Sequence, residues 1–307
     1  MAHYYFAPNT ISEAQLETWS HQGAIRGSSL TYQAIKSTLE NADSPYAGKN
    51  IEVFLQGSYG NATNIYAESD VDVVILLKDC FQQDLKALSE EQKTAWRAAY
   101  HDAVYAHRDF KKDVVSVLRD AYGGDVTVGD KAIAIAARGV RRKADVIAAI
   151  GYRRYYRFNG LRDQSYDEGI CFYDAAGTRI ANYPKQHAEN LTAQHQATQQ
   201  RLKPMVRIWK NLRSALVEAA AIEAGAAPSY YLEGLLYNVP VDKFVGSYGD
   251  TFVNVYNWLV TEADKTQLVC ANRQYYLLRD NAPTCWAPAQ CEAFLAATLA
   301  YWDDWGA

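Results

Sequence analysis

The sequence lacks the features that mark membrane-bound, secreted and zinc-ribbon proteins. No apolar run approaches the roughly 20 residues that cross a bilayer, and residues 1–10 contain neither a basic segment nor the apolar core of a signal peptide. The five cysteines are odd in number and show no CxxC spacing, which argues against a zinc ribbon and a disulfide framework. We therefore expect a cytoplasmic protein with free thiols and no membrane partner.

An excess of positive charge is also missing. The chain has 31 Lys and Arg against 35 Asp and Glu, a net charge of -4, whereas non-specific nucleic-acid binding needs many phosphate-neutralising cations. A local basic pocket for a triphosphate is compatible with this balance. The 49% of hydrophobic residues in 307 can bury a large core. The 23 tyrosines and 7 tryptophans fit either a base-stacking cleft or packing between lobes.

The order of hydrophobic patterns predicts an α+β protein with two lobes. β-like runs are confined to the first part of the chain, and helical patterns dominate beyond about residue 183. We expect a mixed-sheet lobe over residues 1–185, which begins with a long N-terminal helix, and a helical lobe over residues 186–307. The helices expected in the first lobe cover residues 12–42, with breaks near Gly23 and Gly27, and 89–122. The strands expected there cover residues 51–56, 70–77, 143–149, 152–158 and 169–172.

Two aspartates open an apolar strand in the segment Ser69-Asp70-Val71-Asp72. Successive side chains of a strand point to opposite faces, so Asp70 and Asp72 share a face about 6.6 Å apart along the chain. Two carboxylates in this position repel each other unless a cation neutralises them. Mg²⁺ prefers oxygen ligands and keeps substrate phosphates in its shell. The pair predicts an Mg²⁺ site, with Mn²⁺ as the alternative ion; a solvated strand end is the competing interpretation.

The residues Gln56, Gly57 and Ser58 follow directly on the preceding strand. Glycine lets the backbone approach a phosphate without a Cβ clash, and backbone N–H groups together with the Ser58 hydroxyl can hold a triphosphate. A Gly-Ser pair alone is common. A strand, Gly-Ser, about a dozen polar residues and then Ser-Asp-x-Asp opening an apolar strand is far more specific. This whole pattern predicts nucleotide binding beside a metal.

A third carboxylate is needed to complete a two-metal site and to accept the nucleophile's proton. Asp145 lies in a strand-like run downstream and is the candidate. The competing interpretation is an edge residue paired with its basic neighbours, which are Arg141, Arg142 and Lys143.

A cationic stripe runs along the amphipathic helix expected over residues 198–213. Lys203, Arg207 and Lys210 follow one another at positions i, i+4 and i+7 with no interleaved acid. They suit a triphosphate tail and would supply the counter-charge that the aspartates require. A solvated helix face is the competing interpretation of these three cations.

The segment Tyr152–Asn159 mixes aromatic residues and arginines. Aromatic rings stack on bases, and an Asn side chain can donate to and accept from one base edge. An ordinary strand with alternating Arg and Tyr explains the segment equally well. His187 and His195 are expected to be polar surface residues without a role.

These motifs resemble those of the polymerase-β-type nucleotidyltransferases. The similarity is closer still to the bacterial CD-NTases, relatives of cyclic GMP-AMP synthase and oligoadenylate synthase, and within them to the CdnE clade. It covers most of the chain, through residues Gln56–Asn64, Ser69–Val74, Asp145, Asn182–His187, Lys203–Lys210 and Pro228–Asn238.

The resemblance implies a two-lobed fold and Mg²⁺-dependent synthesis of a cyclic di- or trinucleotide from nucleoside triphosphates. The expected substrates are ATP and UTP, with CTP as a further candidate. The product would act on a separate effector protein in antiphage defence. The zinc insertion and basic platform of the animal DNA sensor are missing, so activation by double-stranded DNA is not expected.

The resemblance also implies roles for individual residues. Asp70, Asp72 and Asp145 would hold the metals. Ser58 would bind the donor phosphates, Lys203 and Lys210 the triphosphate, and Asn159 a uracil base. The leading hypothesis is therefore a synthase of a uridine-containing cyclic dinucleotide, such as cyclic di-UMP or cyclic UMP-AMP. Addition of nucleotides to RNA or a small acceptor, and a catalytically silent nucleotide-binding module, are the alternatives.

Overall fold

The computed structural model describes residues 11–23, 25–67, 70–282 and 284–303. The N-terminal segment 1–10 and Ser69 of the aspartate motif therefore lie outside the described residues. Among the described residues, no helix combines the length and apolar character that crossing a membrane requires.

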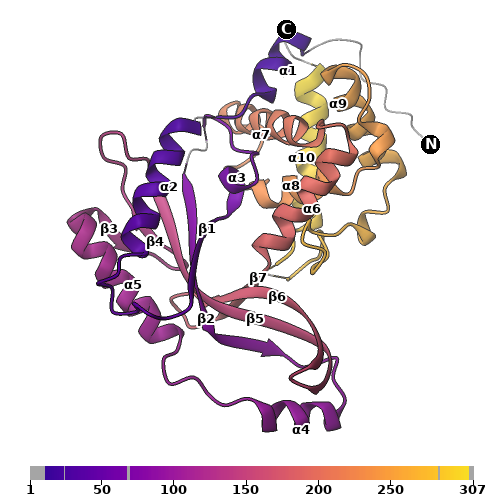
Figure 1. Cartoon of the computed structure of the whole chain (residues 1–307). Helices are drawn as coiled ribbons and strands as arrows, with labels where there is room; N and C mark the ends of the chain where they lie inside the picture. Colours follow the sequence, from indigo (N-terminus) through magenta and orange to yellow (C-terminus); the bar gives the residue numbers. More distant parts are fainter. Residues whose placement is uncertain (1–10, 24, 68–69, 283, 304–307) are drawn as a thin grey trace. The chain divides into compact units, whose positions relative to one another are not determined.

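The chain forms two compact units, each discontinuous in sequence (Figure 1). One division between the units falls between Pro184 and Lys185, next to the boundary at residue 185 that the hydrophobic pattern suggests. Segments 1–25 and 57–69, however, group with the C-terminal helices instead of with the sheet. We call the units the helical unit (Met1–Ile25, Gly57–Ser69, Lys185–Ala307) and the sheet unit (Arg26–Gln56, Asp70–Pro184).

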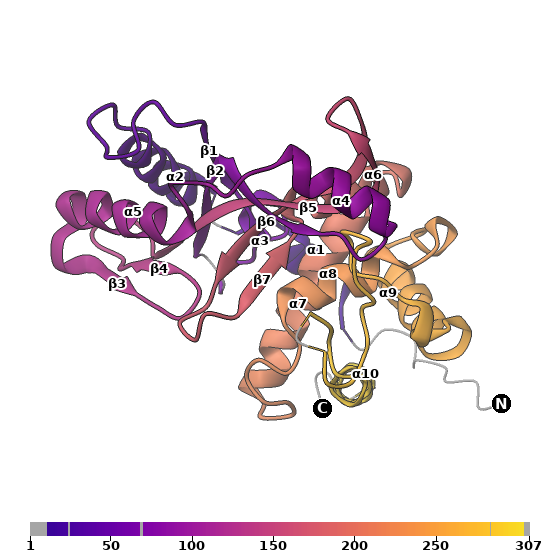
Figure 2. The same cartoon turned by 90° about the horizontal axis from the view of Figure 1, so that it is seen from below.

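A seven-stranded mixed sheet forms the centre of the sheet unit. Its order is β1-β2-β5-β4-β3, and β6 and β7 continue it beyond the second half of β5 (Figure 2). β2 and β5 run parallel, and the other described pairs are antiparallel. The strands are β1 (Ile51–Leu55), β2 (Val71–Asp84), β3 (Val126–Val128), β4 (Ile133–Ile135), β5 (Ala144–Gly160), β6 (Asp163–Tyr173) and β7 (Arg179–Asn182).

Both faces of β2 are buried in its first half, as expected for a central strand with a near-continuous apolar run. Val73 and Ile75 point to one face, and Val74 and Leu76 point to the other. On the first side, the helix α5 (His107–Tyr122) packs against β2 and β5. The strand continues to Asp84, beyond its expected end at residue 77, and the polar residues at its beginning stand out against this apolar run.

The strand β5 is one continuous element, although the sequence suggested two strands over 143–149 and 152–158. Its pairing with β6 is irregular after Tyr155 and again after Phe158. The first irregularity inserts a residue between Tyr155 and Arg157, so Tyr155 and Phe158, three positions apart, are buried in the same apolar cluster.

An aromatic cluster covers this second half of β5. The helix α4 (Glu90–Ala99) contributes Trp96, whose ring lies 6.2 Å from that of Tyr155. The guanidinium of Arg153 stacks 4.1 Å from the centre of the Phe81 ring. Tyr155 and Arg153 are thus used in packing the sheet unit. The base-stacking interpretation of this segment is not supported for these residues.

The helical unit encloses one large apolar core. Trp209, Phe252 and Trp302 are buried at its centre, and the last two rings stack 4.3 Å apart. Leu16 joins the same core, which explains why the helix over residues 13–20 groups with this unit. The helices are α1 (Glu13–Ser20), α3 (Gly57–Gly60), α6 (Pro184–Ala197), α7 (Leu202–Glu218), α8 (Ser229–Tyr237), α9 (Tyr248–Asn257) and α10 (Pro288–Asp303).

Two helices expected to be long are each divided. The first ends at Ser20, and α2 (Ile25–Leu39) begins after the break near Gly23, whereas Gly27 lies inside α2. A Cβ on Gly23 would come within 2.5 Å of the Ile65 backbone, so this position requires glycine. The region 89–122 contains α4 and α5, separated by residues 100–106.

Candidate active site

The three candidate metal ligands lie at one edge of the sheet unit, where β2 and β5 begin. Asp72 and Asp145 are register partners on these parallel strands, so their side chains stand side by side on one face. Asp70 comes directly before β2. We call Asp70, Asp72 and Asp145 the carboxylate edge. The parallel pairing brings together two residues that lie far apart in the sequence.

A lysine ammonium already lies among these carboxylates. Nζ of Lys143 is 2.5 Å from Oδ2 of Asp70 and 3.7 Å from Oδ2 of Asp145. The hydrogen bond to Asp70 raises the pKa of Lys143, and the charges of Asp145, Asp70 and Asp72 add to this effect against partial desolvation. The carboxylate edge therefore attracts a cation, and Lys143 supplies one.

The donor set fits a hard divalent ion, because carboxylate oxygens are the ligands that Mg²⁺ and Mn²⁺ take in proteins. Lys143 marks the position where positive charge is favoured. Within the described residues, however, no three His, Cys, Asp or Glu side chains are arranged as a ready metal site. A metal bound to the Oδ2 atoms of Asp70 and Asp145 would occupy the oxygens that Lys143 contacts.

The Gly-Ser segment begins where β1 ends. The Gln56 backbone N–H donates to the carbonyl of Asp72 at 3.0 Å, which ties the end of β1 to the start of β2. The buried Oε1 atom of Gln56 has no hydrogen-bond partner in the described part of the chain. Gly57 has a φ of 66°, in the left-handed region that favours glycine, and it opens the short helix α3 with Ser58. The predicted polar loop is thus partly helical.

In the helical unit, Ser58 is held by Lys210 of α7. Nζ of Lys210 donates to Ser58 Oγ at 2.7 Å, to Glu233 Oε1 at 3.0 Å and to Thr63 Oγ1 at 3.3 Å. These three acceptors use the three donors of the ammonium. Since Ser58 accepts from Lys210, its own hydroxyl hydrogen is left to donate to another group, such as a phosphate oxygen.

The carboxylate of Glu233 is the centre of a buried polar network. Oε2 accepts from Asn61 Nδ2 at 2.9 Å and from His187 Nε2 at 2.7 Å, and Oε1 accepts from Thr63 as well as from Lys210. Burial by itself raises the pKa of Glu233. The Lys210 charge and the hydrogen bonds from His187 and Thr63 outweigh burial and hold that pKa well below its ordinary value. We call these residues, with Ser58, the Glu233 network.

Sequence reasoning missed most of this network. His187 is buried and bonded to Glu233, so its interpretation as a surface residue was wrong. Glu233 had a usable signal, because it is a lone acid among the buried residues Leu232, Leu235 and Leu236 of α8. A buried acid requires a cationic partner, and Lys210, on the apolar side of its helix, was available.

The cationic stripe of α7 is not a solvated face, and its members do not converge on one point. Nζ of Lys203 donates to Thr192 Oγ1 at 3.2 Å. Arg207 donates to the backbone carbonyls of Ser20 and Ala62. Only Lys210 is joined to Ser58, while Lys203 is near enough to Glu233 to interact with its charge. Because both acceptors are backbone carbonyls, the contacts of Arg207 hold the helical unit together.

Asn159 is not brought together with the carboxylate edge. It lies 14 residues beyond Asp145 on the same continuous strand, a span on the order of 45 Å if fully extended. Its amide donates to Asp163 Oδ2 at 2.8 Å and accepts from Gln92 Nε2 at 3.2 Å, which closes the turn between β5 and β6. These contacts give Asn159 a structural role at the hairpin end.

The match to known proteins is extensive. Residues 189–303 match the cGAS/DncV-like nucleotidyltransferase C-terminal helical domain. Over 298 residues the chain is 41% identical to the cyclic UMP-AMP synthase of Rhodothermus marinus, which covers 96% of this chain and 99% of that protein. The chain is a CdnE-like member of the CD-NTases. It is therefore a nucleotidyltransferase.

Solved structures of other CD-NTases have the same fold. The Rhodothermus marinus CdnE structure with Apcpp and Upnpp superposes with a TM-score of 0.86 at 39% identity, covering 97% of this chain and 98% of that one. The Elizabethkingia meningoseptica CdnE structure with GTP and Apcpp gives a TM-score of 0.74 at 28% identity, covering 97% and 100%. The predicted α+β class, with a mixed sheet and a helical C-terminal part, is confirmed.

Proposed function

We propose that this CD-NTase joins ATP and UTP into a uridine-containing cyclic dinucleotide, with cyclic UMP-AMP as the leading product. The observation that carries this proposal is the 41% identity to a cyclic UMP-AMP synthase along almost the whole chain. The structure of the Rhodothermus marinus enzyme contains an analogue of each nucleotide. Cyclic di-UMP and CTP-derived products are the alternatives to be tested, since curated relatives at 31% identity include dipurine and dipyrimidine synthases.

Asp70, Asp72 and Asp145 are the residues that would hold Mg²⁺ or Mn²⁺. When bound, such an ion supplies positive charge that lowers the pKa of an attacking hydroxyl and stabilises the negative charge of the triphosphate. Asp145 then accepts the proton of the ribose hydroxyl. Its position beside Asp72, on a rigid central strand, fixes the carboxylate for this role.

Ser58 donates its hydroxyl hydrogen to a phosphate oxygen of the donor nucleotide, because Lys210 occupies its acceptor position. Lys210 is thus a positioning residue that acts through Ser58. The carboxylate of Glu233 fixes Lys210 in turn. Gly57 leaves the backbone open to the triphosphate, and Lys203 adds positive charge to the helical unit. The Oε1 atom of Gln56, which has no partner in the described part of the chain, would accept a hydrogen bond from the bound nucleotide.

Each linkage forms one bond from a ribose oxygen to an α-phosphorus and breaks the bond from that phosphorus to the pyrophosphate leaving group. Two such steps close a cyclic dinucleotide and release two pyrophosphates. No external oxidant or reductant is needed, and the proton of each hydroxyl leaves with the base.

The identity of the reaction product tests this proposal. The purified chain is incubated with Mg²⁺ and the four nucleoside triphosphates, of which one at a time carries an α-³²P label, and then treated with phosphatase. We expect a phosphatase-resistant product that takes label from UTP and ATP, with the mass of cyclic UMP-AMP. The matched control is Asp72→Asn. Label found only in phosphatase-sensitive species, or only in added RNA, would contradict cyclic synthesis.

We also propose, from the CD-NTase resemblance, that the product acts on a separate effector protein in defence against phages. Cells that carry the chain with its neighbouring genes should resist phage infection, and the Asp72→Asn variant should not. Equal plaque counts for the two strains would contradict the role in defence without affecting the synthase assay.

A further inference from the structure

A cavity of about 890 Å³ opens beside α5 in the sheet unit. It is lined by Cys80 and Gln82 of β2, by Ile150 of β5 and by one side of α5. Ile150 and Asp145 are five residues apart in a regularly paired stretch of β5, so they point to opposite faces of the sheet. The cavity is therefore separate from the carboxylate edge, and no role proposed above uses it.

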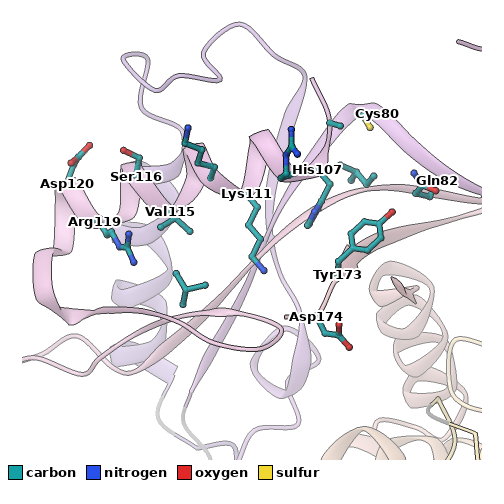
Figure 3. Close-up of a pocket in the computed structure, with 15 residues that line it drawn as sticks. Cys80, Gln82, His107, Lys111, Val115, Ser116, Arg119, Asp120, Tyr173 and Asp174 are labelled. Carbon is teal, nitrogen blue, oxygen red and sulfur yellow. The ribbon is translucent and has the colours of Figure 1, made fainter. Parts of the chain in front are cut away.

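The walls of the cavity combine apolar and cationic surfaces. Val115 of α5, Val128 of β3 and Ile150 provide apolar contact, and Tyr173 at the end of β6 adds an aromatic ring. Figure 3 shows Lys111 and His107 reaching from α5 toward Tyr173. The volume lies within the range of roughly 300–1,000 Å³ that small-molecule sites occupy.

Three of the four cations that line this cavity have no acidic partner among the residues that the structure describes. Lys111, Lys112 and Arg119 make no ion pair there, and Arg108 pairs only with its exposed neighbour Asp109, at 3.7 Å. Other cations of the sheet unit, such as Lys78 and Arg141, contact acids within 3 Å. The cavity is thus lined by four cations, which are Arg108, Lys111, Lys112 and Arg119, against the two carboxylates of Asp120 and Asp174.

His107 lines the cavity as an uncharged residue. His107 Nε2 lies 3.0 Å from the carbonyl oxygen of Ala148, which can only accept, so this nitrogen carries the hydrogen. Burial lowers the pKa of His107, and its ring packs 5.0 Å from that of Tyr173. The two rings form a surface suited to a flat apolar group, while the charge comes from the lysines and arginines.

We propose that this cavity binds a small organic anion, with its flat apolar body against Tyr173 and Val115 and its anionic group at Lys111 and Arg119. A nucleic-acid backbone fits less well, because it requires an extended line of cations. Here the cations lie only between residues 108 and 119 of α5, and the carboxylates of Asp120 and Asp174 also line the cavity.

The test uses two fluorescent probes of similar shape, anilinonaphthalene sulfonate and neutral N-phenylnaphthylamine. We expect the anionic probe to bind wild type at least about fivefold more tightly than the neutral one, as one favourable ion pair contributes. The double substitution Lys111→Gln and Arg119→Gln should remove this preference. The matched control is Arg162→Gln, because Arg162 is an exposed cation of the same unit outside the cavity.

A competition experiment locates the probe. Apcpp, a nucleotide analogue, should leave the bound probe in place, and product synthesis by the double variant should equal that of wild type. The proposal is overturned if the double variant binds the anionic probe as wild type does, or if Apcpp displaces it. It is also overturned if a short RNA displaces the probe and itself depends on Lys111 and Arg119, because the surface would then be a nucleic-acid site.

Discussion

Nζ of Lys143 lies 2.5 Å from Oδ2 of Asp70 and 3.7 Å from Oδ2 of Asp145, so one ammonium joins two of the three proposed metal ligands. All three side chains are partly exposed, which weakens each ion pair through solvent screening. A divalent ion carries twice the charge and can replace the ammonium. Lys143 and the proposed metal would therefore compete for the same oxygens.

Substituting Lys143→Gln should increase the affinity of the chain for Mg²⁺. Removing the competing ammonium, whose ion pairs are exposed and individually weak, should lower the apparent Kd about threefold to tenfold. The measurement is the rise in Tm over a series of Mg²⁺ concentrations, with isothermal titration calorimetry as the second readout.

The exposed lysine Lys131 provides the matched control, and Lys131→Gln should leave the Mg²⁺ titration unchanged. A lower Mg²⁺ affinity in Lys143→Gln would show that Lys143 positions the carboxylates for the metal instead of competing with it.

Asp145→Asn should abolish product formation with little effect on folding. The amide removes one negative ligand and the proton acceptor, so the rate should fall at least about 100-fold. Because the side chain is partly exposed and makes only a 3.7 Å ion pair, Tm should change by no more than a few degrees. The control is Asp102→Asn, which alters an exposed aspartate outside the carboxylate edge. Retained synthesis in Asp145→Asn would remove Asp145 from the site.

The sequence indicates that Asp70 and Asp72 lie near each other because the determinants of this arrangement are local. Alternation along one strand places Asp70 and Asp72 beside an apolar run, and the spacing of Asp145 within a second apolar run is equally visible. The parallel register that pairs Asp72 with Asp145 comes from hydrogen bonds between strands. Periodicity in the sequence does not specify such long-range pairing.

The Glu233 network was largely missed because its members come from segments that are far apart in the sequence. Ser58, Lys210 and Glu233 lie on α3, α7 and α8, and their burial depends on tertiary packing. The position of Asn159 was missed for a related reason. Two strands that looked separate are one, and this continuity places Asn159 at a hairpin end far from Asp145.

Glu233→Gln should destabilise the protein strongly. Lys210 is completely buried, and the amide leaves its ammonium without a counter-charge. Breaking a buried ion pair from one side costs about 3–5 kcal/mol, which should appear as a lower midpoint in urea unfolding. The Kd for UTP should rise as well, since Ser58 would lose its fixed orientation.

A double variant separates these two effects. Lys210→Met combined with Glu233→Leu removes both charges and should recover part of the free energy of unfolding. Recovery is partial because Asn61, His187 and Thr63 still lose their acceptor. UTP binding should stay weak in this variant. Recovery of both stability and binding would show that the pair acts only in folding.

His195 should make stability depend on pH below neutrality. Burial, together with the nearby charges of Lys203 and Arg207, lowers its pKa from 6.5 to about 4, and its Nδ1 accepts the Lys203 backbone N–H at 3.3 Å. Between these pKa values the unfolded chain binds a proton that the folded chain does not. The free energy of unfolding therefore rises as pH increases from 4 to 6.5 and falls as the solution is acidified.

Replacing His195 with Gln should flatten this part of the pH profile. Since the ring is partly exposed, solvent screening reduces the effect to about 1 kcal/mol across the window. Urea unfolding of wild type and His195→Gln at a series of pH values gives the difference, and His101→Gln, at an exposed histidine, is the matched control. Parallel profiles for wild type and His195→Gln would mean that His195 becomes protonated without cost, so that its Nδ1 contact contributes nothing to folding.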